Sequence, residues 1–237
     1  DGHSGWIEHL LPIVEREALP VTLYVATGHV QSGRPYWFDA LVNALQTGEP
    51  LTLDTAAAGL GTITLNRERG AANWLRLSAL FEALKALDAD ARDALVQRLI
   101  ADTDDAVAGQ RRPRFRALQP LTPADVRTLA QSRWVTLGSH SHGHELLDRI
   151  ALAEAADSIT RSIALLRKWS GQEVVHFAYP NGNYNAALAA ALPGLGLKSA
   201  VTTRHGLWRR DGALFELPRV AVGRYDDLPR LRLSLLG

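Results

Sequence analysis

Short apolar runs alternate with amphipathic helical patterns along this chain, and this alternation restricts the possible folds more than any other feature. The first run, residues 21–26, is rich in β-branched residues and follows a helical pattern over residues 4–18. Further runs of the same kind occur at residues 134–137, 174–178, 200–202 and 215–222. Repeated helix–strand units favour a largely parallel sheet. The sequence therefore predicts an α/β fold, as a barrel or an open wound sheet, with a further strand expected before Asp1.

The region from about residue 36 to 120 follows a different pattern. Apolar residues recur at helical spacing over three segments, and two short strands separated by Ala and Gly predict a hairpin. The helices are expected at residues 37–45, 73–87 and 88–100, and the hairpin at 51–54 and 62–65. The basic segment 110–116 is interpreted as an exposed connector. We interpret residues 36–120 as a mainly helical insertion within a single domain that spans residues 1–237.

The composition narrows the functional classes without choosing among them. The chain carries 26 Lys and Arg against 25 Asp and Glu, and its net charge of +1 gives no support for nucleic-acid binding. No apolar run approaches the roughly 18 residues of a membrane-spanning helix, so no membrane span is predicted. Because the chain contains no cysteine, disulfides, thiolate metal ligands and a cysteine nucleophile are excluded.

Three of the eight histidines lie within five residues, directly after the predicted strand at residues 134–137. His140 and His144 are four residues apart, so a single helical turn would direct both side chains to one side. Two neutral imidazoles that converge on one point form a natural pair of metal ligands, whereas His142 would point elsewhere. The alternative interpretation is a polar loop whose histidines face the solvent.

Four segments share the order and spacing of a known set of motifs. Asp1-Gly2 is similar to the end of a Thr-Phe-Asp-Asp-Gly motif, and residues 19–28 are similar to the strand that follows that motif. His140-Ser141-x-x-His144 matches a His-Ser/Thr-x-x-His motif. Residues 177–182, Phe-Ala-Tyr-Pro-Asn-Gly, are similar to a proline-containing wall of a substrate groove. Together these motifs resemble those of the polysaccharide deacetylase family.

The resemblance covers residues 1–30 and about 120–222, and it implies both a fold and an activity. Members of the family are metal-dependent hydrolases that remove N-acetyl groups from amino sugars of poly- or oligosaccharides, on a distorted (β/α) barrel. The residues that match the family's metal ligands are Asp1, His140 and His144. A site with two imidazoles, one carboxylate and open positions suits Zn²⁺, and the general order of affinities allows Co²⁺ or Ni²⁺.

The resemblance also implies an acid and a base, and here the chain departs from the family pattern. The family's general base is the residue immediately before the carboxylate ligand, and that position precedes Asp1. The third motif of the family often carries an Arg that pairs with the base, but Ala178 occupies that region. Many members supply the general acid from a late Leu-x-x-His segment, and residues 228–237 contain no histidine. His205 is therefore the candidate acid, and a loop histidine without a catalytic role is the alternative.

Substrate-binding candidates lie in the third motif. Tyr179, next to Pro180 at a strand end, is the candidate for stacking against a sugar ring, because loops at strand ends often carry function. Asn181 and Tyr184 are candidates for contacts with sugar hydroxyls, with a turn-forming role as the alternative. Trp74 lies on the apolar face of a predicted helix, and we therefore expect it in the core.

Several alternatives remain open from the sequence. The same fold could hydrolyse another amide or an ester, or it could bind glycans without catalysis if the general base is absent. A serine hydrolase built on Ser139 or Ser141 is disfavoured, because no Gly-x-Ser-x-Gly elbow is present. The resemblance favours an extracytoplasmic or cell-envelope location, with a cytoplasmic one possible, and the sequence gives no indication of the oligomeric state.

Overall fold

The computed structural model describes the chain except for residues 46–49, 67–70, 107–117, 224–225 and 236–237. By its contacts the chain divides into two compact units. One unit combines Asp1–Arg34 with Gln119–Gly237, and the other is Pro35–Leu118. The second unit corresponds closely to the segment that the sequence marks as an insertion.

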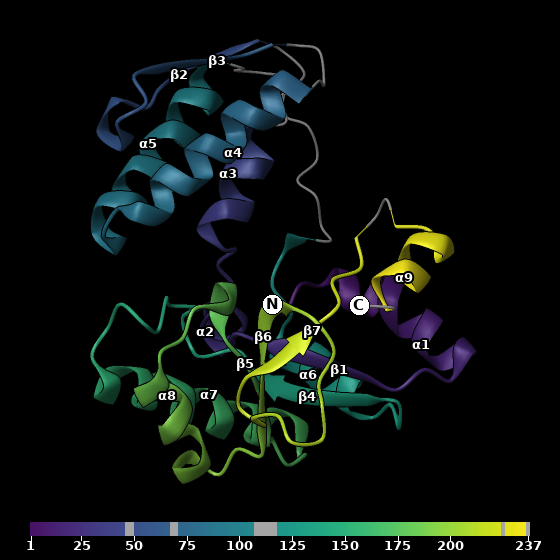
Figure 1. The fold of residues 1–237 in the computed structure, drawn as a ribbon. Helices are drawn as coiled ribbons and strands as arrows, with labels where there is room; N and C mark the ends of the chain where they lie inside the picture. Colours follow the sequence, from purple (N-terminus) through teal and green to yellow (C-terminus); the bar gives the residue numbers. More distant parts are fainter. Residues whose placement is uncertain (46–49, 67–70, 107–117, 224–225, 236–237) are drawn as a thin grey trace. The chain divides into compact units, whose positions relative to one another are not determined.

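The first unit is built on a five-stranded sheet in the order β1-β4-β5-β6-β7. Each neighbouring pair is parallel, from the β1–β4 pair to the β6–β7 pair. The strands are β1 (Val21–Val25), β4 (Val135–Ser139), β5 (His176–Ala178), β6 (Ser199–His205) and β7 (Leu217–Arg219). Figure 1 shows these strands at the centre of the unit with helices around them. This arrangement confirms the predicted α/β fold with a parallel sheet.

Helices connect and cover the strands of this unit, and local sequence signals explain several of them. The helices are α1 (Leu11–Glu17), α2 (Thr27–Ser32), α6 (Pro123–Ala130), α7 (Leu152–Ser170), α8 (Ala186–Ala191) and α9 (Leu228–Ser234), with shorter turns η1 (Trp6–Leu10), η4 (Pro180–Gly182) and η5 (Leu192–Leu195). Helix α6 begins with a capping box in which Thr122 and Asp125 satisfy each other's backbone N–H groups. Helix α7 buries Ile159, Ile163 and Leu166 on one face, as its apolar spacing predicts.

The core of the first unit lies between the sheet and these helices. Leu137 of β4, Phe177 of β5 and Ile159 of α7 have no exposed surface, and all three belong to one apolar cluster. Full burial of such side chains contributes roughly 1.5–3 kcal/mol each to folding. Strand β4, which leads to the histidine loop, is therefore anchored in this core.

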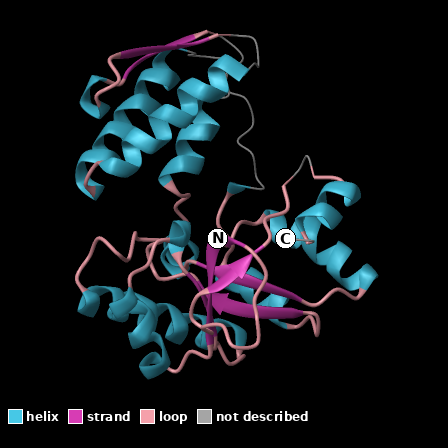
Figure 2. Cartoon of the chain, viewed as in Figure 1, coloured by secondary structure: helices cyan, strands magenta, loops and turns pink. Residues whose placement is uncertain are grey.

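The second unit packs helices against a two-stranded antiparallel hairpin (Figure 2). Its elements are α3 (Trp37–Leu45), β2 (Leu51–Asp54), η2 (Ala56–Ala58), β3 (Thr62–Leu65), α4 (Ala71–Ala86) and α5 (Ala89–Ala106). Leu41, Leu80 and Leu99 are fully buried in a core separate from that of the first unit. The prediction for Trp74 is wrong, because its side chain is 70% exposed. The apolar stripe of α4 is buried at Leu80 and Leu84 but not at the start of the helix.

The bounds of β6 and β7 differ most from those predicted. Strand β6 continues to His205, because its last residue still pairs with Arg219 of β7. Strand β7 is shorter than the apolar run at residues 215–222 and covers only Leu217–Arg219. Among the described residues, no helix is both long enough and apolar enough to cross a membrane.

Candidate metal centre

The backbone at the ends of two neighbouring strands positions Asp1 and His140. The His140 N–H donates a hydrogen bond to the Val25 carbonyl at the end of β1, over 3.1 Å. The Ala26 N–H, one residue further along, donates to the Asp1 carbonyl over 3.3 Å. Because β1 and β4 are parallel, both contacts lie at the carboxyl edge of the sheet, where parallel α/β folds bind ligands.

Asp1, His140 and His144 form a compact group of possible metal ligands, one ligand atom from each lying within 4.8 Å of the others. His140 Nε2 lies 3.2 Å from Asp1 Oδ1, and His144 Nε2 lies 3.8 Å from Asp1 Oδ2. The two imidazole rings are nearly perpendicular, with centroids 4.8 Å apart. The structure therefore brings together the three residues that match the family's ligand motifs, and it does not leave His140 and His144 as solvent-facing loop residues.

The environment of His140 fixes its protonation. Its Nδ1 lies 2.7 Å from the Ala178 carbonyl at the end of β5, and since a carbonyl can only accept, Nδ1 carries the proton. The ring is buried, with 8% of its side chain exposed. Burial disfavours the charged form and lowers the pKa of His140 to about 3 and that of His144 to about 2. Both rings are therefore neutral at pH 7.

His144 reaches the site by a route other than the predicted helical turn. Residues 140–144 are not helical, and Ser141 and His144 adopt left-handed backbone conformations with φ of 63° and 59°. Such a conformation costs a residue other than glycine roughly 1–2 kcal/mol. The loop therefore needs specific contacts to hold it. His142 points elsewhere, as expected, and its Nδ1 lies 2.9 Å from the Thr27 hydroxyl.

The first residues of α2 fasten this loop to the end of β1. The Thr27 N–H donates to the Ser141 carbonyl over 3.3 Å, and the Gly28 N–H donates to the His142 carbonyl over 2.6 Å. A side chain on Gly28 would place its Cβ 2.6 Å from that carbonyl oxygen. Only glycine allows this close approach. In the sequence these two residues were only part of the strand-like motif at residues 19–28, so this role was missed.

Gly28→Ala is expected to destabilise the protein by about 1–3 kcal/mol, because the added methyl group must push away backbone rather than a flexible side chain. Urea unfolding of both proteins measures this difference. Gly194→Ala is the matched control, since a Cβ at Gly194 meets nothing within 4 Å. Equal losses in the two variants would show that the close approach at Gly28 is not responsible.

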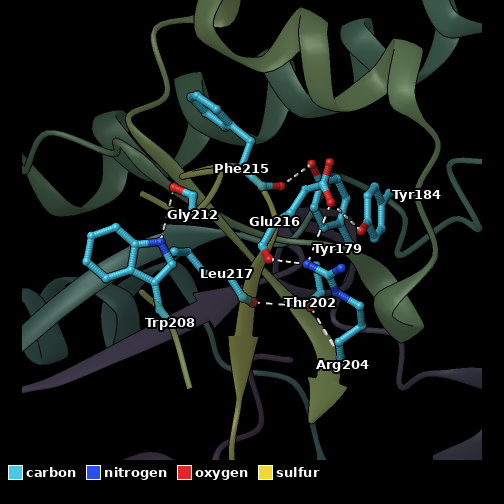
Figure 3. Close-up of polar contacts among 9 residues, drawn as sticks. All are labelled: Tyr179, Tyr184, Thr202, Arg204, Trp208, Gly212, Phe215, Glu216 and Leu217. Atoms are coloured by element: carbon cyan, nitrogen blue, oxygen red, sulfur yellow. Dashed lines mark hydrogen bonds and ion pairs between the residues drawn. The ribbon is translucent and has the colours of Figure 1, made fainter. Parts of the chain in front are cut away.

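Two of the predicted substrate contacts are wrong, because the side chains are buried. Tyr179 is 1% exposed, and its hydroxyl donates a hydrogen bond to the Phe215 carbonyl over 2.9 Å (Figure 3). Its ring stacks against Tyr184, with centroids 4.7 Å apart, so it is not available to a sugar. Pro180 is buried at the start of the turn η4. Both side chains therefore pack inside the protein at the end of β5.

Tyr184 and Asn181 keep some exposed surface. The Tyr184 hydroxyl donates to Glu216 Oε2 over 2.9 Å, and Arg204 lies 3.6 Å from the same oxygen (Figure 3). Burial and the hydrogen bond to Glu216 raise the pKa of Tyr184. Asn181 is exposed, has a left-handed φ of 56°, and donates to the Asn183 side chain over 2.8 Å. Asn181 thus has the backbone conformation of a turn-forming residue, which was the alternative interpretation of its role.

The candidate acid, His205, is the last residue of β6 and is exposed. It lies four residues beyond Val201, which pairs with Ala178 of β5, while β6 itself runs past the end of that neighbour. His205 therefore lies at the carboxyl edge of the sheet, the same edge at which Asp1 and His140 lie.

The donor chemistry at the site fits a divalent metal ion. With its proton on Nδ1, His140 directs a lone pair from Nε2 toward a carboxylate oxygen of Asp1 only 3.2 Å away. Two acceptors at this distance repel each other unless a cation lies between them, and burial disfavours a second proton on the ring. A tetrahedral zinc ion with ligand distances of about 2.0–2.2 Å separates its ligand atoms by roughly 3.3–3.6 Å. The distances of 3.2 and 3.8 Å bracket that range.

The sequence of the chain also matches a known protein family. The profile of the polysaccharide deacetylase family matches residues 71–200, which is more than half of the chain. The chain belongs to the polysaccharide deacetylase family. The histidine loop lies within the matched residues, whereas Asp1 lies outside them. A search among curated protein sequences found no match.

Solved structures of deacetylases share the fold of this family member. A de-N-acetylase from Aggregatibacter actinomycetemcomitans has a TM-score of 0.56 at 12% identity, over 99% of this chain and 72% of its own. The Streptococcus pyogenes deacetylase PplD, in complex with acetate, has a TM-score of 0.55 at 14% identity, over 99% and 67%. IcaB from Ammonifex degensii has a TM-score of 0.52 at 16% identity, over 99% and 69%. At these identities the likeness concerns the fold alone.

Proposed function

We propose that this protein is a metal-dependent deacetylase that removes N-acetyl groups from amino sugars of an oligo- or polysaccharide. Asp1, His140 and His144 hold the metal ion, for which zinc is the best match. The single observation that carries this proposal is the unprotonated Nε2 of His140 facing a carboxylate oxygen at 3.2 Å, an arrangement that calls for a cation. Membership of the deacetylase family supports the choice of reaction.

The residues of the chain have separate roles in this proposal. The Ala178 carbonyl holds the proton of His140 on Nδ1 and so keeps Nε2 available as a ligand. A bound zinc ion supplies a water of lowered pKa and polarises the acetamide carbonyl. The general base is assigned to the residue before Asp1, and His205 is the candidate acid for the departing amine. Tyr184 and Asn181, which retain exposed surface, are the candidates for contacts with sugar hydroxyls.

Metal analysis combined with acetate release tests the proposal. The full-length protein is expected to contain about one zinc ion per chain, as a single three-ligand catalytic site requires. It is expected to release acetate from N-acetylglucosamine oligomers, and to lose this activity on treatment with a chelator and regain it with Zn²⁺. Cobalt or nickel should restore activity too, since both suit the same ligands.

Other outcomes separate the alternatives. Metal without acetate release would turn attention to other amides or esters, or to a glycan-binding protein without a general base. Determining the residue before Asp1 then discriminates between them, because an Asp at that position supports catalysis. The absence of metal after reconstitution with zinc would overturn the proposal. We further propose a cell-envelope glycan as the substrate, in keeping with the family resemblance.

A further inference from the structure

A second carboxylate, that of Glu145, lies directly after the histidine loop and organises its backbone. Three consecutive amide groups of the loop, those of residues 142–144, point to polar side chains. The His142 N–H donates to the Ser158 hydroxyl over 3.0 Å, and the His144 N–H donates to the Ser141 hydroxyl over 3.0 Å. The Gly143 N–H between them donates to Glu145 Oε1 over 3.1 Å. One side-chain network thus satisfies all three donors.

Glu145 determines the direction of both hydroxyl groups. The Ser141 hydroxyl donates to Glu145 Oε2 over 2.8 Å, and the Ser158 hydroxyl lies 2.9 and 3.0 Å from the two oxygens of Glu145. Because a carboxylate only accepts, each serine hydroxyl must donate its hydrogen bond to Glu145. The oxygen lone pairs of both serines are then free to accept from the loop amides. Ser158 is on α7, so the network also ties the loop to a helix of the core.

We infer that Glu145 is a positioning residue for the metal centre, holding the strained backbone that presents His144 beside Asp1 and His140. The expected effect on metal binding rests on the proposed function. The contacts that hold the loop do not, because they are hydrogen bonds between residues of the chain. The left-handed conformations of Ser141 and His144 flank the amides that Glu145 and its two serines hold. Within the described part of the chain, the Glu145 carboxylate is the acceptor for both hydroxyl groups, so its loss removes the contacts that orient them.

The network predicts that glutamine cannot replace Glu145. Three donors converge on two oxygens, the hydroxyls of Ser141 and Ser158 and the Gly143 N–H. A glutamine offers one oxygen and one NH₂ group in place of two accepting oxygens, so at least one of these three donors loses the acceptor that Glu145 provides. Gly143 gives an independent way to disturb the same contact, because its Cβ would lie 2.6 Å from Glu145 Oε1. The end of the Glu145 side chain would have to move.

The experiment compares wild type with Glu145→Gln and Gly143→Ala in the full-length protein, using two measurements. Amide hydrogen exchange of residues 142–144 is recorded on the metal-free protein, and the zinc Kd is obtained by competition with a chromophoric chelator. Both variants are expected to exchange these amides faster than wild type. They are also expected to bind zinc about 10–100-fold more weakly, the usual cost of losing an outer-shell partner. Glu154→Gln, an exposed acid on α7, is the matched control and should behave as wild type.

The two measurements keep this inference distinct from the proposed function. If wild type binds zinc and Glu145→Gln binds it equally well, Glu145 has no positioning role and the inference is overturned. Unchanged exchange of the three amides would overturn it as well. If wild type binds no zinc at all, the proposed function fails, while faster exchange in the variants would still support the role of Glu145 in holding the loop. Loss of exchange protection throughout the protein would instead indicate general unfolding and count against a local role.

Discussion

His140→Ala is expected to weaken zinc binding by at least about 100-fold, beyond the range usual for an outer-shell residue, and to abolish acetate release. The substitution removes the ligand whose geometry is most strongly determined. His140 is held by the Val25 carbonyl through its backbone and by the Ala178 carbonyl through Nδ1. Alanine keeps the backbone contact but loses both the Nδ1 contact and the Nε2 atom that would bind the metal ion. The measurements are the zinc Kd and acetate release from N-acetylglucosamine oligomers.

A second variant distinguishes the loss of a metal ligand from a loss of structure, which could also abolish zinc binding in His140→Ala. Alanine at position 140 leaves the buried Ala178 carbonyl without its donor, which costs about 1–3 kcal/mol. Asp1→Asn removes the carboxylate charge with almost no change of shape and leaves that carbonyl paired. It should lose zinc while circular dichroism remains that of wild type. His9→Ala is the control, because His9 is exposed. Retention of zinc by both His140→Ala and Asp1→Asn would place the metal elsewhere.

Local signals in the sequence predicted most of the elements of this protein. Helix α6, for example, begins with a capping box whose two partners, Thr122 and Asp125, lie within one turn, so a short stretch of sequence is enough to form it. The alternation of helical and apolar segments predicted the parallel sheet, since this pattern reflects burial on both faces. His140 directly follows β4, and the Asp1 carbonyl accepts a hydrogen bond just past the end of β1, so both residues lie at one edge of the sheet. The three candidate metal ligands, which the structure brings together, could therefore be proposed from motif resemblance alone.

The conformation of the histidine loop could not be predicted in the same way. A helical turn was the simplest route that directs His140 and His144 to one side. The protein instead uses left-handed Ser141 and His144, whose cost is offset by contacts with Ser158, a residue on another element. Such tertiary contacts leave no periodic signal in the sequence. The importance of Glu145 was missed for this reason.

The aromatic residues show a second limit of sequence reasoning. Tyr179 was expected in the groove because it lies at a strand end, but its hydroxyl finds a partner in the Phe215 carbonyl, so the whole residue can be buried. The position of a residue at a strand end determines which edge it occupies, not whether it faces the solvent. Trp74 shows the opposite error, because it was expected in the core but is exposed. An apolar stripe shows which face of a helix turns inward, but not how much of the helix length is covered by the elements packed against it.

The metal-free protein is expected to lose stability steeply as the pH falls below about 6.5. Unfolded histidines have a pKa near 6.5, whereas burial lowers the pKa of His140 to about 3 and that of His144 to about 2 in the folded protein. Between these values the unfolded chain binds protons that the folded chain excludes, so acid favours unfolding. From about one pH unit above 6.5 these rings are neutral in both states, and their contribution to stability no longer changes. Integrated from pH 6.5 to 5.0, the two rings together cost about 3 kcal/mol.

Urea unfolding of the metal-free protein at several values of pH between 5.0 and 7.5 measures this loss. His140→Asn has one titrating ring fewer and should show a decline smaller by about half, because each buried ring contributes its own share. His9→Ala is the control and should decline as steeply as wild type, since His9 is exposed and both buried rings remain in this variant. Equal pH dependence in wild type and His140→Asn would mean that His140 is protonated in the folded protein. In that case a proton, and not a metal ion, would bridge His140 and Asp1.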